Sequence, residues 1–139
     1  MSVREVGRVI QPQGISEIIL VVKDVRRAAK FYHQVVGLAV DQPANDTWAW
    51  LWAGPPGAPQ RIGLTRGPLS FGAAHCKGPI HFALRIAPGE LERALEHLHA
   101  RGIEVEGPVA FPAWKARSIY FDDLDGNRVE LCALPEEQR

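Results

Sequence analysis

Two side chains that could bind a metal or transfer a proton lie inside apolar segments of this sequence. His81 and Glu130 each have an apolar residue on either side, so each is a polar group within a predicted core strand. Burying a carboxylate costs free energy unless an arginine or a metal ion compensates its charge. Two interpretations follow. Either the pair helps to hold a metal, or His81 is a hydrogen-bonded core residue and Glu130 pairs with Arg85 or Arg128.

Tyr120 and Ser118 are candidates to act on a substrate next to Glu130. Tyr120 stands ten residues before Glu130 across a short turn, so a hairpin places both side chains on one face of a sheet. Ser118 stands two residues before Tyr120, so in a strand it lies on the same face. It could donate a hydrogen bond to a substrate oxygen. The alternative is that Tyr120 is an ordinary core aromatic.

Tryptophans form a second group of candidate binding residues. Trp48, Trp50 and Trp52 alternate along one segment, which in a strand places three indoles on one face. Indole rings offer a flat apolar surface and one hydrogen-bond donor, which suits a planar or aromatic ligand. The same row could instead seal the sheet against helices or a second copy. Trp114, before the last predicted hairpin, is a candidate lid residue, and Arg85 is counted among the candidate substrate-binding residues.

The composition is that of a globular domain, with 139 residues, 46% hydrophobic content, and 16 Lys and Arg against 16 Asp and Glu. This size supports one domain, and a zero net charge without a basic run argues against nucleic acid or a membrane surface as partner. The longest apolar run, residues 18–22, is far below the roughly 18 residues of a membrane span. The absence of a signal-peptide pattern and of paired cysteines favours a cytoplasmic protein with free thiols.

The first half of the chain predicts a strand, a helix and three more strands. Apolar residues recur at helical spacing after Asp24, which can cap the helix, and Gly37 stands where a terminating glycine belongs. The predicted elements are a strand over 15–23, a helix over 25–36, and strands over 38–40, 47–53 and 61–65.

The second half repeats this order. It predicts a strand over 79–86, a helix over 88–101 ended by Gly102, and strands over 103–106, 116–122 and 127–131. Placing Glu17 on His81, Gly37 on Gly102 and Gly63 on Glu130 gives offsets of 64, 65 and 67, which indicates an internal duplication. The predicted organisation is an arm (1–14), a βαβββ module (15–66), a linker (67–78), a second βαβββ module (79–133) and a tail (134–139).

Three segments of the second module carry a family resemblance. IHFALRI at 80–86, ARGI at 100–103 and SIYFDDLDGNRVEL at 118–131 resemble the second module of the vicinal oxygen chelate superfamily, and residues 18–38 resemble its first. That superfamily joins glyoxalase I, bleomycin-resistance proteins, fosfomycin-resistance enzymes and extradiol dioxygenases. The resemblance implies an α+β fold in which two tandem βαβββ modules form a curved mixed sheet around a cavity.

The resemblance also implies four metal-ligand positions, which fall on Glu17, Gly63, His81 and Glu130. Three of them carry possible ligands and one is empty. Glu17 replaces the more common His or Gln, and Gly63 replaces the Glu often found in glyoxalase I. The three occupied positions are those used by ring-cleaving dioxygenases and fosfomycin-resistance enzymes, where a Tyr at the place of Tyr120 contacts the substrate.

Two further inferences follow from this donor set. Two carboxylates and one imidazole would neutralise a divalent ion and favour Mn²⁺, Mg²⁺ or Fe²⁺ over Zn²⁺. The fosfomycin enzymes have a Lys twenty residues before the last ligand where this chain has Ala110, which disfavours phosphonate substrates.

The leading hypothesis is therefore a cytoplasmic, divalent-metal-dependent enzyme that chelates neighbouring oxygens of a small substrate. Ring-cleaving dioxygenase chemistry on a catechol-like compound is favoured, and a glyoxalase-type isomerase or lyase is the next choice. The alternative from another class is a metal-free module that sequesters a planar drug-like molecule. Each module is near the lower limit of independent stability, so a homodimer is also expected.

Overall fold

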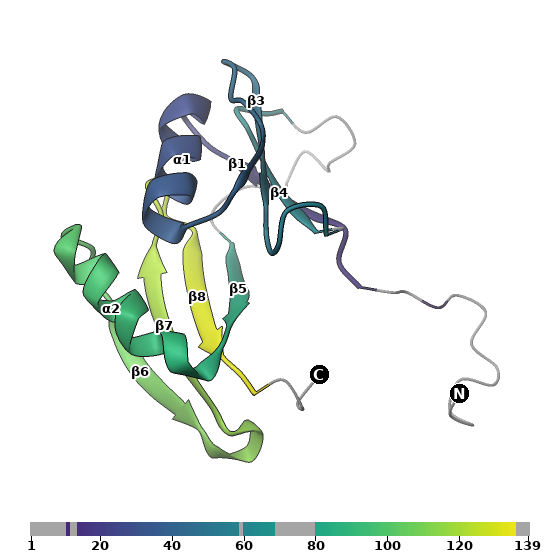
Figure 1. Cartoon of the computed structure of the whole chain (residues 1–139). Helices are drawn as coiled ribbons and strands as arrows, with labels where there is room; N and C mark the ends of the chain where they lie inside the picture. Colours follow the sequence, from purple (N-terminus) through teal and green to yellow (C-terminus); the bar gives the residue numbers. More distant parts are fainter. Residues whose placement is uncertain (1–10, 12–13, 59, 69–79, 136–139) are drawn as a thin grey trace.

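The computed structural model describes residues 11, 14–58, 60–68 and 80–135 (Figure 1). Most of the predicted arm, linker and tail therefore lies outside the described residues.

The first module forms a four-stranded sheet with one helix. Its elements are β1 (Glu17–Val21), α1 (Val25–Phe31), a π-helical turn (Tyr32–Val36), β2 (Val40–Gln42), β3 (Trp48–Trp52) and β4 (Arg61–Thr65). The strand order is β1-β4-β3-β2, in which β1 and β4 are parallel and the other pairs are antiparallel. The first and last strands of the module therefore lie side by side.

The second module repeats this topology. Its elements are β5 (His81–Ile86), a 3₁₀ turn (Pro88–Glu90), α2 (Leu91–Ala100), β6 (Glu106–Phe111), a 3₁₀ turn (Pro112–Trp114), β7 (Ala116–Asp122) and β8 (Arg128–Ala133). The strand order is β5-β8-β7-β6, with β5 and β8 parallel. The predicted α+β class and the predicted βαβββ repeat are confirmed.

Two predicted elements differ from those in the structure. The strand predicted over 103–106 is wrong, because this stretch is a connection and the strand begins at Glu106. Gly107 and Pro108 look like turn residues in sequence, yet β6 is an edge strand with a register shift between Glu106 and Val109, and an edge tolerates proline. The predicted helix over 25–36 is α-helical only to Phe31 and then widens into the π turn.

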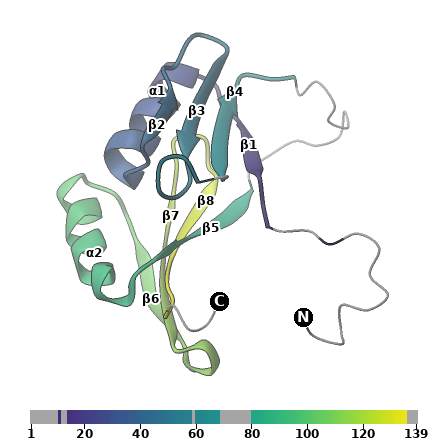
Figure 2. The same cartoon turned by 45° about the vertical axis from the view of Figure 1, so that its right-hand side comes forward.

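Each helix covers one face of its own sheet, which leaves the other face uncovered by helix (Figures 1 and 2). We call this second face the open face of each sheet. The helices are seven and ten residues long, and no helix in the described ranges is long and apolar enough to cross a membrane. The open faces are where the site residues predicted from sequence have to be sought.

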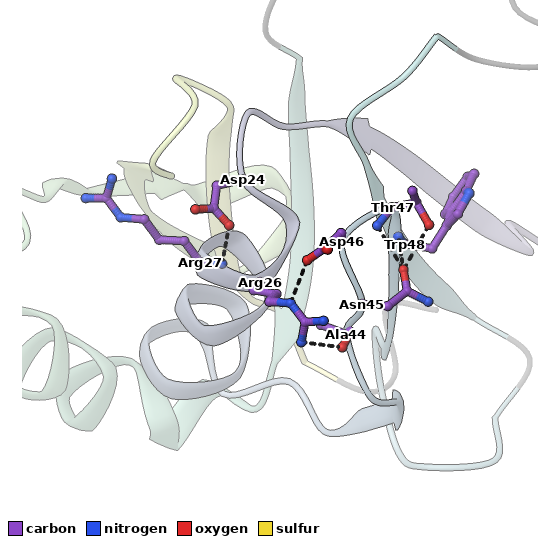
Figure 3. Close-up of polar contacts among 8 residues, drawn as sticks. All are labelled: Asp24, Arg26, Arg27, Ala44, Asn45, Asp46, Thr47 and Trp48. Atoms are coloured by element: carbon purple, nitrogen blue, oxygen red, sulfur yellow. Dashed lines mark hydrogen bonds and ion pairs between the residues drawn. The ribbon is translucent and has the colours of Figure 1, made fainter.

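Polar contacts at the start of α1 hold the loop that leads into β3 (Figure 3). Asp24 caps the helix by accepting a hydrogen bond from the Arg27 amide at 3.0 Å. Arg26 donates to Asp46 at 2.9 Å and to the Ala44 carbonyl at 3.1 Å. In the same loop, the Asn45 side chain accepts from the backbone amides of Thr47 and Trp48, each at 2.8 Å, and so sets where the tryptophan strand begins.

A buried tyrosine joins the two modules. Tyr32 is fully buried, and its hydroxyl donates to Asp123 Oδ2 at 2.6 Å, while its ring stacks on Phe82 with the centroids 6.4 Å apart. Asp123 also accepts from the backbone amides of Asp125 and Asn127, both at 2.8 Å. Burial, reinforced by the bond to Asp123, raises the pKa of Tyr32 above its ordinary value, so the hydroxyl remains a donor.

The substitution Tyr32→Phe removes one hydrogen bond from the buried Asp123 without removing the ring. We expect a loss of about 1–3 kcal/mol in the free energy of unfolding, because a buried acceptor loses its partner. Urea unfolding of the full chain measures this loss. Tyr120→Phe is the matched control, since the chain has two tyrosines and Tyr120 is only partly buried. Equal stability of the two variants would contradict the prediction.

Candidate functional site

The candidate site lies on the open face of the second sheet. Along β5, Phe82 is buried on the face of the sheet that the helix covers, whereas His81 and Arg85 are exposed on the opposite face. In the strand register, Tyr120 lies directly opposite Glu130 on the neighbouring strand. The alternation of strand side chains therefore brings His81, Tyr120 and Glu130 to one surface.

His81 and Glu130 are in direct contact. His81 Nε2 lies 2.9 Å from Glu130 Oε1, and the second carboxylate oxygen accepts a hydrogen bond from Ser118 Oγ at 2.7 Å. The His81 side chain is 53% exposed and that of Glu130 is 15% exposed, so the pair opens to solvent through the imidazole. Ser118 is fully buried, and its hydroxyl donates a hydrogen bond to Glu130, which fixes the orientation of the carboxylate.

Tyr120 lies against this pair. Its ring meets the His81 ring edge to face, with the centroids 5.9 Å apart, and the Arg128 guanidinium lies 5.6 Å from its centroid. Desolvation raises the pKa of Tyr120 above its ordinary value, and the nearby Glu130 carboxylate raises it further. The phenol therefore stays protonated at neutral pH and can donate a hydrogen bond to a ligand oxygen.

The spacing of the pair fits two ligands of one metal ion. Two donor atoms bound at right angles to an octahedral ion, each at about 2.1 Å, lie about 3.0 Å apart. His81 Nε2 and Glu130 Oε1 lie 2.9 Å apart, and one imidazole nitrogen with one carboxylate oxygen is a usual donor combination. The same distance is also a normal hydrogen bond, so the pair is satisfied without a metal.

Glu17 does not join this pair in the single chain. It is exposed at the first residue of β1, on the open face of the first sheet, and its partner in the strand register is Arg61. Within the described part of the chain, no group of three or more His, Cys, Asp or Glu side chains lies close enough to hold a metal. The structure thus brings together two of the three predicted ligands.

The empty ligand position is covered by an indole. A Cβ atom on Gly63 would lie 2.7 Å from Trp50 Cζ3 and 2.8 Å from Ile19 Cδ1, closer than real Cβ contacts. Gly63 lies opposite Trp50 in the antiparallel register of β3 and β4. With glycine at this position, the Trp50 ring and the Ile19 side chain fill the space that a Cβ atom would occupy, so an aromatic surface stands where a ligand side chain could have been.

The tryptophan row forms a layered surface on the first sheet. The rings of Trp48 and Trp50 are nearly parallel, at 4°, with centroids 5.6 Å apart. The Arg61 guanidinium also lies over the Trp50 ring, 4.3 Å from its centroid, and is held by Asp41 at 2.9 Å. The sequence analysis missed Arg61, although its position two residues before Gly63 places it on the same strand face.

The other candidate binding residues are separate from the His81–Glu130 pair. Trp52 lines a cavity of about 600 Å³ between the modules. Trp114 is 59% exposed at the tip of the β6–β7 hairpin and stacks on Phe111. Arg85 lies opposite Cys132 in the strand register, on the face that carries His81. The predicted ligand contacts of these residues stay predictions.

The sequence profile of the Glyoxalase/Bleomycin resistance protein/Dioxygenase superfamily matches residues 14–131. The chain belongs to this superfamily. Its two βαβββ modules agree with the resemblance noted in the sequence. No curated protein sequence matches the chain.

Solved structures with the same fold cover most of the chain. An integron cassette protein from the mobile metagenome of the Halifax Harbour sewage outfall is 25% identical, with a TM-score of 0.72, over 88% of this chain and 100% of that one. Lactoylglutathione lyase from Agrobacterium tumefaciens is 23% identical, with a TM-score of 0.70, over 88% and 94%. The fosfomycin resistance protein FosX from Listeria monocytogenes, in complex with Mn(II) and sulfate, is 24% identical, with a TM-score of 0.67, over 93% and 96%.

Gly63→Ala tests whether Trp50 excludes a side chain from the second ligand position. We expect a loss of about 1–3 kcal/mol in the free energy of unfolding, because the new methyl group overlaps the indole and Ile19. In a double-mutant cycle, Gly63→Ala combined with Trp50→Ala should cost less than the sum of the single changes. Additive costs in denaturant unfolding would show that the two positions are independent.

Proposed function

We propose that this protein is a divalent-metal-dependent enzyme that chelates two neighbouring oxygens of a small substrate. His81 and Glu130 are two ligands and Glu17 is the third. The observation that carries the proposal is the 2.9 Å distance between His81 Nε2 and Glu130 Oε1. A hydrogen bond from Ser118 to the other carboxylate oxygen fixes the orientation of Glu130. Such pre-orientation by a neighbouring hydrogen bond is what metal-binding carboxylates need.

The third ligand is proposed to come from a second copy of the chain. Glu17 and the His81–Glu130 pair lie on the open faces of different sheets, and within one described chain they form no three-residue cluster. In such a homodimer, the open face of the first module of one copy would pack against the open face of the second module of the other copy. This packing would bring Glu17 of one copy to the His81–Glu130 pair of the other. It would also cover Val21, an exposed apolar side chain on the same face of β1 as Glu17.

A divalent ion in this position would supply Lewis-acid stabilisation of negative charge on two adjacent substrate oxygens. The residues of the chain do the rest. Ser118 holds Glu130, the His81 ring is packed against Tyr120, and the Tyr120 hydroxyl is placed to donate to a substrate oxygen. Desolvation and the Glu130 carboxylate raise the pKa of Tyr120, which suits its hydroxyl to donate a hydrogen bond that orients the substrate.

Ring cleavage of a catechol-like compound by a dioxygenase reaction is the favoured chemistry, and a glyoxalase-type step is the next choice. The support comes from the donor pattern without a fourth ligand, since Gly63 is covered by Trp50, and from Tyr120 beside the ligand pair. The layered Trp48 and Trp50 rings offer a surface against which an aromatic ring could stack.

A metal-free binding protein for planar molecules is the second candidate. It is favoured by the tryptophan surface and by the fact that His81, Glu130 and Ser118 already satisfy one another through hydrogen bonds. The two candidates differ in one measurable property, which is whether a divalent metal binds.

The metal content of the purified protein tests the proposal. We expect the chain to bind Mn²⁺ or Fe²⁺ under anaerobic conditions with at least micromolar affinity. His81→Ala or Glu130→Ala should weaken this binding by about 100-fold or more, which exceeds the usual loss when a residue that only supports a ligand is removed. Titration calorimetry with the full chain measures both affinities. His99→Ala, which changes an exposed histidine on α2, should leave the affinity unchanged.

Absence of divalent metal binding would overturn the enzyme proposal and favour the binding protein. If metal binds, oxygen uptake with a panel of catechols distinguishes the dioxygenase from the glyoxalase-type alternative.

Glu17→Gln tests the third ligand. The substitution should weaken the metal affinity and leave the unfolding midpoint of the monomeric chain unchanged, because Glu17 is exposed. A Glu17→Gln protein with unaltered metal affinity would exclude Glu17 as the third ligand.

A further inference from the structure

A second cavity opens beside the proposed ligand pair. It measures about 400 Å³ and lies where the chain leaves α2 and enters β6. Its polar lining consists of Glu104, Glu106, Tyr120, Asp122 and Arg128. Tyr120 is shared between this cavity and the site, because the same ring packs against His81 and lies opposite Glu130 in the register. A ligand held at the pair would extend across Tyr120 into the cavity.

Among the described residues that line this cavity, Arg128 is the only cation, and it is already paired with carboxylates. The Arg128 guanidinium forms an ion pair with Glu106 and a second one with Asp122, at 3.2 Å, while it lies over the Tyr120 ring. A guanidinium that donates to two carboxylates has little capacity left for an anionic ligand. Arg128 therefore neutralises part of the lining rather than attracting a negatively charged substrate.

The remaining charge of the cavity is negative. Three carboxylates, on Glu104, Glu106 and Asp122, face one guanidinium, which leaves a formal charge of −2. Among the residues that the structure describes, none forms a hydrogen bond or an ion pair with the Glu104 side chain. The cavity thus presents an uncompensated carboxylate to whatever part of a ligand enters it.

We infer that this cavity selects substrates by the charge of their side chain, accepting an ammonium or other cationic group and disfavouring a carboxylate, sulfonate or phosphonate. The inference rests on the proposed function, because it assigns the part of the substrate that lies beyond the two chelating oxygens. Glu104 is the specificity-determining residue, because Arg128 is paired with Glu106 and Asp122 instead. The metal-ligand pair and the cavity then recognise different ends of one molecule.

Three catechols that differ in the charge of their tail test this inference. Dopamine carries an ammonium, 4-ethylcatechol is neutral and 3,4-dihydroxyphenylacetate carries a carboxylate, while all three present the same vicinal oxygens. Binding to the metal-loaded full chain is measured by titration calorimetry at pH 7 without turnover. We expect dissociation constants to rise in the order cationic, neutral, anionic, with about tenfold or more between the ends at low ionic strength. Added salt should narrow this difference.

Glu104→Gln is the diagnostic variant, because Glu104 forms no ion pair with any residue in the part of the chain that the structure describes. This variant should reduce the ratio of the dissociation constants of 3,4-dihydroxyphenylacetate and dopamine by about threefold. The control is Glu96→Gln on α2, which removes the same charge away from the cavity and should leave the ratio unchanged. Equal narrowing by both variants would overturn selection by the cavity, since it would show a long-range effect of net charge.

The remaining outcomes separate this inference from the proposed function. If 3,4-dihydroxyphenylacetate binds as tightly as dopamine or more tightly, charge selection by the cavity is overturned and the metal-dependent function stands. If the loaded protein binds none of the three catechols, the catechol class is overturned together with the inference. If the chain binds no metal, the enzyme proposal fails first, and that result comes from the metal titration alone.

Discussion

The arrangement of this protein depends on the buried contact between Tyr32 and Asp123. Each module alone is a small sheet with one short helix, which buries too little apolar surface to be very stable. Tyr32 is placed by the π-helical turn after α1, and its hydroxyl and ring reach Asp123 and Phe82 in the other module. Asp123 is in turn held by the amides of its own turn. This polar network aligns the modules while their apolar side chains form one core.

Because the helices and this contact occupy one side of each sheet, the chemistry is confined to the open faces. The second sheet carries a polar cluster, in which Ser118 fixes Glu130 and Glu130 contacts His81. The first sheet carries an aromatic surface, in which Trp50 covers Gly63. The duplication has thus diverged, because the positions that hold His81 and Glu130 in the second module hold Glu17 and Gly63 in the first, where the Trp50 ring lies over the glycine.

The sequence predicted the βαβββ repeat, and it predicted that Tyr120 and Glu130 share one face of the second sheet, for a simple physical reason. Strand side chains alternate with a period of two, so parity alone places Tyr120 and Glu130 on the same face once they are joined by a short turn. Boundaries were less predictable where glycine and proline stand inside an edge strand, as Gly107 and Pro108 do in β6. The role of Ser118 was also hidden, because parity gives the face of a residue but not the acceptor of its proton.

What the sequence by itself determined is the local and periodic part of the protein: the βαβββ order, the capping residues, the absence of a long apolar run, and the polar side chains that stand inside apolar strands. Only the tertiary structure decided which of these residues meet. It brought His81 to Glu130 and left Glu17 on another sheet, it laid an indole over Gly63, and it paired Arg128 with Glu106 and Asp122. These outcomes depend on the packing between strands distant in sequence, and a pattern of neighbouring residues does not encode those distances directly.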